Sequence, residues 1–398
     1  MPTFLIFAVC AFASGFALRL TDPIVLPIAH HFGVAATAAA LLNTAYALPY
    51  ALAQPFLGPL GDRFGKARCI QVCVAALAAM LALGAVAPSF ALLLATRVVA
   101  GICAGGLIPL VLASIGDRYG MHERQVMIGR MLLAIISGQM LGSVVSGIAN
   151  EAFGWRSPLF VAAGVAVVAA GFAWLAIPAS AHQRPAGHTP GASFRALYGR
   201  VFENPKAVWL YGAVLVEGLL FFGLFPYVGS LLLEHAGPGG AVLSSQTGFV
   251  LGAFGIGGLA YAIAVPLLIR TFGVARMCLI GAIGAGLCYA ALAFLPLWWL
   301  AALAMLIAGF CYYMLHNSMQ TEATELAPSA RGSAVALFAC GFFTGQALGP
   351  LLFGPLMHTV GFAATLIGTG VALALLGVVF VRSVVAGRER VEPLAAEG

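Results

Sequence analysis

The turn that decides the fold reads Gly58-Pro59-Leu60-Gly61-Asp62-Arg63-Phe64-Gly65-Lys66-Ala67-Arg68, and it lies between two long apolar runs. It contains one acid, three bases and three glycines, although charged residues make up only 8% of the chain. Glycine permits the backbone conformations that a tight reversal of the chain requires. Basic residues are enriched in the loops that membrane proteins keep on the cytoplasmic side. The stretch therefore predicts a cytoplasmic turn between two membrane-spanning helices.

The composition of the whole chain supports this interpretation. Of its 398 residues, 62% are hydrophobic and 8% are charged, whereas a soluble domain is about 25% charged. We therefore expect a multi-pass protein in the lipid bilayer. The net charge of +6 comes from bases spread over several loops, so no nucleic-acid partner is expected. The eight cysteines are scattered through or beside apolar runs, which predicts packing roles, with no disulfide, metal or cofactor.

Twelve apolar runs are long enough to cross a bilayer, which takes about 20 helical residues. They cover roughly residues 4–28, 37–60, 69–87, 90–113, 128–149, 157–178, 207–233, 246–269, 276–295, 297–319, 332–355 and 361–382. The expected fold is an all-α membrane protein with twelve transmembrane helices. The predicted parts are an N-terminal six-helix bundle (1–178), a cytoplasmic central linker (179–206), a C-terminal six-helix bundle (207–382) and a cytoplasmic tail (383–398).

The positions of the 19 Lys and Arg residues predict the orientation of the spans. With the N-terminus inside, all but three fall in cytoplasmic segments. Arg19 and Arg97 lie within spans, and Arg156 lies in a loop on the other side. Since Lys and Arg are enriched in cytoplasmic loops, both termini are predicted to be cytoplasmic. The expected location is a bacterial-type inner membrane.

The chain repeats itself at an offset of 207 to 208 residues. Phe-Gly-x-Ala-Arg at 64–68 recurs at 272–276, and Gly-Gln-x-Leu-Gly-x4-Gly at 138–147 recurs at 345–354. Arg124, just before run five, is matched by Arg331 before run eleven. Such a repeat is typical of transporters built from two parallel six-helix halves. The opening turn loses its acid in the second copy, because Arg270 stands where Asp62 would recur.

These motifs resemble the major facilitator superfamily of secondary transporters, in particular its drug and sugar efflux branch of proton antiporters. The turn at 58–68 is similar to the loop between helices 2 and 3 of that family. Asp22-Pro23 with Leu26-Pro27 resembles its first-helix pattern. Arg97-x3-Gly101-x3-Gly105 is similar to the fourth-helix motif, whose Arg faces the cavity. The resemblance covers essentially the whole chain and implies alternating access without a cofactor.

The resemblance also implies a cytoplasmic gate motif made of Gly58, Asp62, Arg63, Gly65, Arg68 and Arg124. We expect Asp62 to accept hydrogen bonds from backbone amides of run eleven or from Arg124. One departure keeps an alternative open. Proton-driven antiporters usually carry Gly-Pro in the middle of helix 5, where this chain has Gly142-Ser143, and its Gly349-Pro350 pair lies in run eleven.

Four charged residues lie inside the predicted spans, where each charge costs several kcal/mol without a partner or a function. They are Arg19, Asp22, Arg97 and Glu217, and their charges sum to zero. Arg19 and Asp22 are three residues apart and share a helix face. Glu217 lies roughly 15 Å into run seven, near the midplane. We predict that Glu217 is the main proton-coupling carboxyl, with Asp22, Arg97 and Arg19 as a second cluster. The alternative for each acid is a structural ion pair.

Polar and aromatic side chains suggest the substrate cavity. Run two carries one helical stripe, formed by Asn43, Tyr46, Tyr50 and Gln54. Further candidates are Gln139, Phe221, Phe222, Phe225, Tyr312, Tyr313, His316, Asn317 and Gln346. The alternative for each is ordinary interhelical packing, and for His316 a structural role is favoured over proton transfer.

The predicted function is proton-coupled secondary transport of a small organic solute, with export favoured, by a protein that is expected to be monomeric. A proton symporter that imports an organic anion is the alternative, favoured by the cavity Arg97 and by the missing proline in run five. A non-transporting membrane sensor is a further alternative. An enzyme is not expected, because no catalytic cluster is found at one depth. Gly255-x-Gly257-Gly258 lies inside an apolar span, so it does not indicate nucleotide binding.

Overall fold

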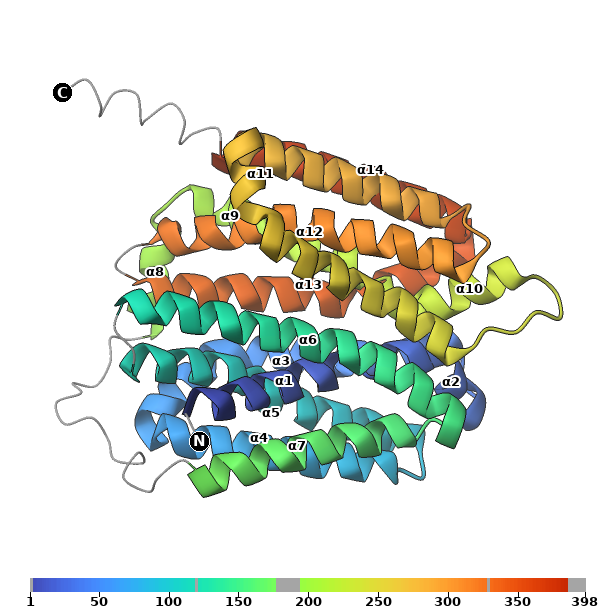
Figure 1. Cartoon of the computed structure of the whole chain (residues 1–398), viewed down its shortest axis with the longest axis horizontal. Coiled ribbons are helices and arrows are strands. Elements are labelled where there is room, and N and C mark those ends of the chain that lie inside the picture. Colours follow the sequence, from blue (N-terminus) through green and yellow to red (C-terminus); the bar gives the residue numbers. More distant parts are fainter. Residues whose placement is uncertain (1–2, 119–120, 177–193, 328–329, 386–398) are drawn as a thin grey trace. The chain divides into compact units, whose positions relative to one another are not determined.

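The computed structural model describes residues 3–118, 121–176, 194–327 and 330–385. Over these residues the chain forms helices joined by short connections, without a strand (Figure 1). An α-helix satisfies its backbone hydrogen bonds within one segment, which is the requirement for crossing a bilayer. The predicted all-α membrane class is confirmed.

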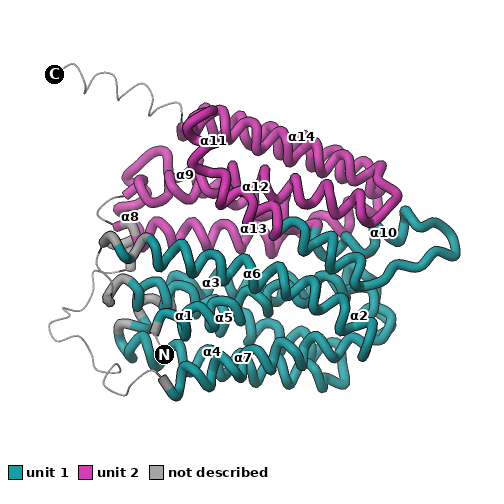
Figure 2. Tube along the Cα trace, in the orientation of Figure 1, with its two compact units in different colours: residues 1–191, 225–255 teal, residues 192–224, 256–398 magenta. Residues whose placement is uncertain are grey.

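The chain divides into two compact units (Figure 2). The first unit comprises Met1–Gly191 and Phe225–Gly255. Its described elements are α1 (Thr3–Arg19), η1 (Asp22–Ile24), α2 (Val25–Phe32), α3 (Ala36–Phe64), α4 (Lys66–Ala85), α5 (Phe90–Arg118), α6 (Met121–Phe153), α7 (Ser157–Ala176), η3 (Phe225–Tyr227), α10 (Val228–Ala236) and the first part of α11 (Ser244–Leu292).

The second unit comprises Ala192–Leu224 and Ile256–Gly398. Its described elements are α8 (Phe194–Phe202), α9 (Lys206–Phe222), the rest of α11, α12 (Trp298–Leu326), α13 (Arg331–Val360), α14 (Phe362–Phe380) and the π-helical turn η5 (Val381–Val385). The two units group residues that contact one another in the structure, whereas the predicted six-helix bundles were defined by the sequence repeat. The boundaries of the bundles therefore remain a prediction. Most of the predicted linker and tail lies outside the described residues.

Within the described residues, ten segments are long and apolar enough to cross a membrane. One of them, α11, has 49 residues and contains a break at Gly273, whose φ is 69° and ψ 170°. It therefore accounts for two predicted spans. The 29-residue α3, which carries the polar stripe, corresponds to the predicted second span. The helices are consistent with twelve predicted spans.

The two copies of the sequence repeat have the same backbone feature. Gly65, between α3 and α4, has a φ of 88°, and Gly273, within α11, has a φ of 69°. Glycine adopts this region without the strain that a side chain would bring. Each Phe-Gly-x-Ala-Arg copy is therefore a reversal between two helices, as the sequence predicted for the first.

Proline interrupts the first helix of each predicted half. α1 ends at Arg19, and the 3₁₀ turn η1, with Pro23, leads into α2. α9 ends at Phe222, and the 3₁₀ turn η3, with Pro226, leads into α10. Proline has no N–H to donate and its ring clashes with the preceding turn. The first break places Asp22, which is 1% exposed, in the interior of unit 1.

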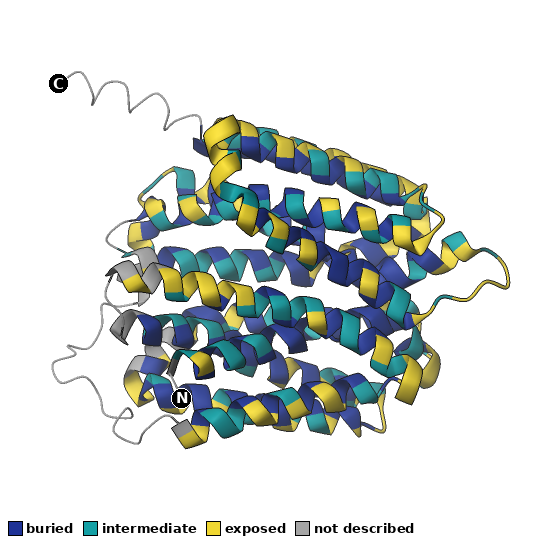
Figure 3. Cartoon of the chain, viewed as in Figure 1, coloured by how far each residue is buried: buried dark blue, intermediate teal, exposed yellow. Residues whose placement is uncertain are grey.

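Glycines allow several helix pairs to pack with their backbones in contact. A Cβ on Gly101 or Gly105 of α5 would collide with the carbonyl oxygens of Tyr46 and Tyr50 of α3. In unit 2, a Cβ on Gly345 of α13 would collide with the Leu215 carbonyl of α9. Small residues allow this close approach in membranes. The outward faces carry exposed apolar side chains (Figure 3), as a lipid-facing surface requires.

Candidate functional site

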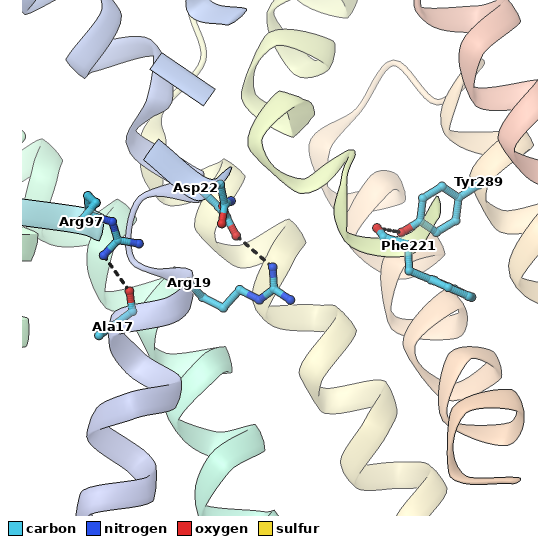
Figure 4. A network of polar contacts seen from close by, with 7 residues as sticks. Ala17, Arg19, Asp22, Arg97, Phe221 and Tyr289 are labelled. Atoms are coloured by element: carbon cyan, nitrogen blue, oxygen red, sulfur yellow. Dashed lines mark hydrogen bonds and ion pairs between the residues drawn. The ribbon is translucent and has the colours of Figure 1, made fainter. Parts of the chain in front are cut away.

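Asp22 lies at the break in the first helix, where two side chains contact its carboxylate. Arg19 Nη1 lies 3.6 Å from Asp22 Oδ2 (Figure 4). The Asn43 amide of α3 donates a hydrogen bond to Oδ1. All three side chains are buried, and a buried charge is tolerated only when it is paired and hydrogen-bonded. Helical spacing predicted the Arg19 contact, whereas the Asn43 contact depends on how α3 packs.

Arg97 of α5 is fully enclosed at 1% exposure, and it joins three helices. Its Nη1 donates to the Ala17 carbonyl at 3.0 Å (Figure 4), and its Nε donates to the Leu42 carbonyl at 3.5 Å. Its Cζ lies 4.1 Å from the centre of the Tyr46 ring, a cation–π contact. Its described hydrogen bonds thus go to main-chain carbonyls of α1 and α3.

The polar stripe of α3 forms one buried face. Its members are Asn43, Tyr46, Tyr50 and Gln54, each at most 4% exposed. The Tyr46 and Tyr50 rings are stacked, with centroids 6.0 Å apart, and the Tyr46 hydroxyl donates to the Ser14 carbonyl at 3.5 Å. Gln139 of α6 lies beside Gly15 of α1. The stripe thus takes part in helix packing as well as in the charged cluster.

Phe225 lies with the first charged cluster. The Cζ of Arg19 is 4.8 Å from the centre of its ring, and Phe254 of α11 packs edge-on against the same ring at 5.3 Å. Phe225 and Glu217 both belong to run seven, so the sequence suggests that they lie near each other. The break at η3 assigns Phe225 to unit 1 and Glu217 to unit 2.

Glu217 of α9 is completely buried and is paired with His316 of α12. Glu217 Oε2 lies 2.8 Å from His316 Nδ1. Among the described residues, the other carboxylate oxygen, Oε1, has no hydrogen-bond partner. The sequence favours a structural role for His316 and does not predict its contact with Glu217. Two titratable side chains at one apolar depth were the available signal, although the two residues are 99 positions apart.

Aromatic rings enclose the imidazole of His316. Tyr312 stacks on it with centroids 4.9 Å apart and an interplanar angle of 24°. Phe342 and Phe338 of α13 lie 4.9 and 5.3 Å from it. Phe338 and Phe342 were not predicted, although their i, i+4 spacing places them on one helix face. The His316 side chain is 14% exposed and the Glu217 side chain is fully buried.

The predicted aromatic residues of α9 contact the same group. Phe221 and Phe222 pack edge-on against Tyr312 at 4.7 and 5.2 Å. The Tyr289 hydroxyl of α11 donates to the Phe221 carbonyl at 2.6 Å (Figure 4). Tyr289 was also missed by the sequence, because a single tyrosine in an apolar run has no distinguishing pattern. The aromatic cluster is therefore assembled from four helices, α9, α11, α12 and α13.

The remaining predicted cavity residues of unit 2 lie on α12 and α13. Asn317 Nδ2 donates to the Tyr261 hydroxyl at 3.2 Å, and the Tyr313 and Tyr261 rings are 6.3 Å apart. Gln346 is buried, with its backbone nitrogen beside Gly218 of α9. These contacts extend the polar and aromatic region along α12.

The predicted gate motif is described only in part. Gly58 and Asp62 belong to α3 and Arg124 belongs to α6, but the structure does not describe the side-chain surroundings at these three positions. Arg63 and Arg68 are exposed, and Arg63 Cζ lies 5.3 Å from the centre of the Phe64 ring. The predicted latch, in which Asp62 accepts hydrogen bonds from backbone amides of run eleven or from Arg124, therefore stays a prediction.

The two units differ in what their buried carboxyls can do. In unit 1, Asp22 faces an arginine, which remains charged at all relevant pH values. In unit 2, Glu217 faces a histidine, which is charged only when it is protonated. Both partners of the Glu217–His316 pair are therefore acid–base side chains. Among the described residues, no group of three or more His, Cys, Asp or Glu side chains could hold a metal ion.

Comparison with known proteins places this geometry in context. The family profile described as "Major Facilitator Superfamily" matches residues 7–333. An uncharacterized MFS-type transporter, YceJ of Bacillus subtilis, is 24% identical over 86% of this chain and 86% of its own length. The 2-nitroimidazole transporter of Escherichia coli is 25% identical over 88% of this chain and 86% of its own. A crystal structure of the nucleoside transporter NupG superposes with a TM-score of 0.77 at 13% identity, covering 96% and 99% of the two chains.

Proposed function

Because the chain belongs to the Major Facilitator Superfamily, and is thus a multi-pass membrane transporter of a small solute, we propose that it is proton-coupled. In this proposal it works by alternating access as a secondary transporter. Proton entry from one side drives a small organic solute out of the cell. The proposal also places the protein in a bacterial inner membrane, with both termini in the cytoplasm.

The observation that carries the proposal is the Glu217–His316 pair. Both side chains are titratable, they lie 2.8 Å apart, and aromatic rings cover them. Burial makes an unpaired carboxylate costly, so the charge of His316 and the proton on Glu217 depend on each other. A proton carrier in alternating access must release its proton when water reaches it from the other side. In the proposal, the protonation state of the pair changes when water reaches it, and this change is the step that couples transport to protons.

The substrate class proposed is a small aromatic or heteroaromatic molecule. Phe221, Phe222, Tyr312 and Phe342 provide ring faces and edges near the pair. Aromatic pairs favour edge-to-face and offset-stacked contacts, so a planar solute is suited to this region. The E. coli relative, a 2-nitroimidazole transporter, supports the same class.

The test uses purified protein in proteoliposomes with an imposed pH gradient. The first solute is 2-nitroimidazole, followed by any molecule that raises the melting temperature in a metabolite and drug screen. Wild type is expected to build a solute gradient from the pH gradient. Glu217→Gln fixes the protonated form in charge and nearly in shape, so it should abolish this accumulation. Exchange of labelled for unlabelled solute, which needs no net proton movement, should continue.

Glu234→Gln, at an exposed position near the end of α10, is the matched control and should accumulate solute normally. His316→Gln should behave like Glu217→Gln, because Glu217 then has no titratable partner. If Glu217→Gln still builds a gradient, Glu217 is a structural residue and Asp22 becomes the candidate proton site.

A second candidate function is proton-coupled import of an organic anion. The observation that favours it is Arg97, which is buried and whose Nη2 has no hydrogen-bond partner among the described residues. A guanidinium is suited to binding a carboxylate. The same proteoliposomes distinguish the two functions, because a symporter accumulates solute on the side that protons enter, whereas an antiporter depletes it there.

A further inference from the structure

A cavity of about 500 Å³ lies within unit 1, apart from the Glu217–His316 pair in unit 2. Its lining residues come from η1, α2, the α6–α7 junction and the start of α11. They include Pro23, His31, Asn150, Trp155, Ser244 and Thr247. Cavities of a few hundred Å³ are large enough to bury a small organic molecule. By the predicted orientation, this is the periplasmic end of the helices.

Trp155, one of the residues that line the cavity, has an indole N–H that can donate a hydrogen bond. Its side chain is largely buried, at 7% exposure. Among the described residues, its indole Nε1 has no hydrogen-bond partner. Buried polar groups normally have one, and an exception calls for an explanation. An acceptor atom on a bound molecule would supply it.

The other walls favour a planar molecule. The His31 ring lies 5.1 Å from the Trp155 ring, so two π systems adjoin at the cavity. Asn150 Nδ2 donates to Ser244 Oγ at 2.9 Å, which adds polar groups on the α11 side. The cavity therefore combines ring faces with a few placed polar atoms, as small-molecule sites do.

The charges around the cavity disfavour a cation. Its described lining residues include His30 and His31 but no Asp, Glu, Lys or Arg. Arg156, which is not among them, holds its Cζ 4.5 Å from the centre of the Trp155 ring. A bound cation would face this guanidinium without a lining carboxylate to offset it, and a bound anion would have no lining Lys or Arg as a partner.

We propose that this cavity is a second solute site, which binds a small, planar, uncharged aromatic or heteroaromatic molecule. A hydrogen-bond acceptor of that molecule meets Trp155 Nε1. Pro23, which lines the cavity, directly follows Asp22 in η1, so the site adjoins the first charged cluster along the chain. A solute held here occupies the predicted periplasmic end of the transport path. The site does not depend on proton coupling.

The experiment uses the full chain in lipid nanodiscs, labelled with 5-fluorotryptophan. Trp155→Phe identifies the Trp155 fluorine resonance. The probes are nicotinamide, which is uncharged, nicotinate, which is an anion, and benzylamine, which is a cation. Nicotinamide is expected to shift the Trp155 resonance saturably, and to bind more tightly than either charged probe.

Calorimetric titration of nicotinamide then measures the contribution of the donor. Trp155→Phe keeps the aromatic wall and removes the N–H, so affinity should fall roughly threefold to tenfold. Trp174→Phe, on α7 with a side chain that is 58% exposed, is the matched control and should bind as wild type does. Trp155 should also respond in Glu217→Gln, which separates this site from the coupled transport proposed above.

Three results would overturn the proposal: no saturable shift of the Trp155 resonance with nicotinamide, unchanged affinity in Trp155→Phe, or tighter binding of a charged probe. If Trp155→Phe fails to fold, wild-type calorimetry with the three probes still decides the matter. No saturable binding of nicotinamide, or tighter binding of a charged probe, would overturn the proposal. Loss of coupled transport in Glu217→Gln with an intact Trp155 shift leaves the site standing.

Discussion

The close packing of α9 against α13 makes Gly345→Ala a sharp test of the structure. An ideal Cβ on Gly345 would lie 2.8 Å from the carbonyl carbon of Leu215 and 2.9 Å from the nitrogen of Leu219. Non-bonded carbon atoms prefer separations of about 3.5–4.0 Å, so the helices must separate locally by at least roughly 0.6 Å. The separation must be larger at the Leu215 carbonyl oxygen, which is the atom nearest to that Cβ. All three neighbours are backbone atoms of α9 and cannot move alone.

Two opposing terms set the magnitude. Overpacking costs about 1–3 kcal/mol, whereas replacing glycine by alanine inside a helix gains about 1 kcal/mol. Because the colliding atoms belong to the α9 backbone, we expect the overpacking cost at the upper end of its range, about 2–3 kcal/mol. The net loss in the free energy of unfolding is then roughly 1–2 kcal/mol. Gly368→Ala in α14 is the matched control, because a Cβ at that position would have no neighbouring atom within 4 Å among the described residues. That variant should gain up to about 1 kcal/mol.

The assay is reversible unfolding in bilayer-like micelles by steric trapping, with both variants measured beside wild type. Gly345→Ala should also reduce solute exchange, because α9 carries Glu217 and the aromatic residues beside it. If Gly345→Ala is as stable as wild type, or if Gly368→Ala is the less stable of the two, the described contact between α9 and α13 is wrong.

Three further predictions address single contacts. Tyr289→Phe removes the hydroxyl that donates to the Phe221 carbonyl at 2.6 Å, and should cost about 0.6–1.7 kcal/mol of unfolding free energy. The control Tyr211→Phe removes a hydrogen bond that is longer, at 3.1 Å, and less buried, so it should cost less. A larger cost for Tyr211→Phe would contradict the geometry. Arg97→Lys keeps the charge but loses the planar fork that reaches two carbonyls, so initial transport rates should fall at unchanged expression, and wild-type rates would show that charge alone matters. Asp62→Asn should weaken transport with near-normal expression, because a helix N-terminus or Arg124 favours an anion there; full transport would remove the predicted latch.

Much of the architecture is local and could therefore be predicted. Apolar runs of about 20 residues have the length of a membrane-spanning helix, which satisfies its backbone hydrogen bonds within one segment. The Gly65 and Gly273 reversals follow from glycine and from the repeat, and the structure shows positive φ at both. The Arg19–Asp22 contact follows from helical spacing. Each of these depends on a sequence pattern that can be read along the chain: an apolar run, a repeated glycine turn or a helical spacing.

The partners of the buried charges depend on tertiary structure. Glu217 and His316 are 99 residues apart, and their contact requires the rotation and depth of α9 relative to α12, which neither helix encodes alone. A span that is apolar all round has no amphipathic stripe to indicate which face meets which neighbour. The break between α9 and η3 likewise separates Phe225 from Glu217, although one apolar run contains both. Composition and periodicity thus determined the helices and their repeat, whereas side-chain pairing was decided by the packing of helices distant in sequence.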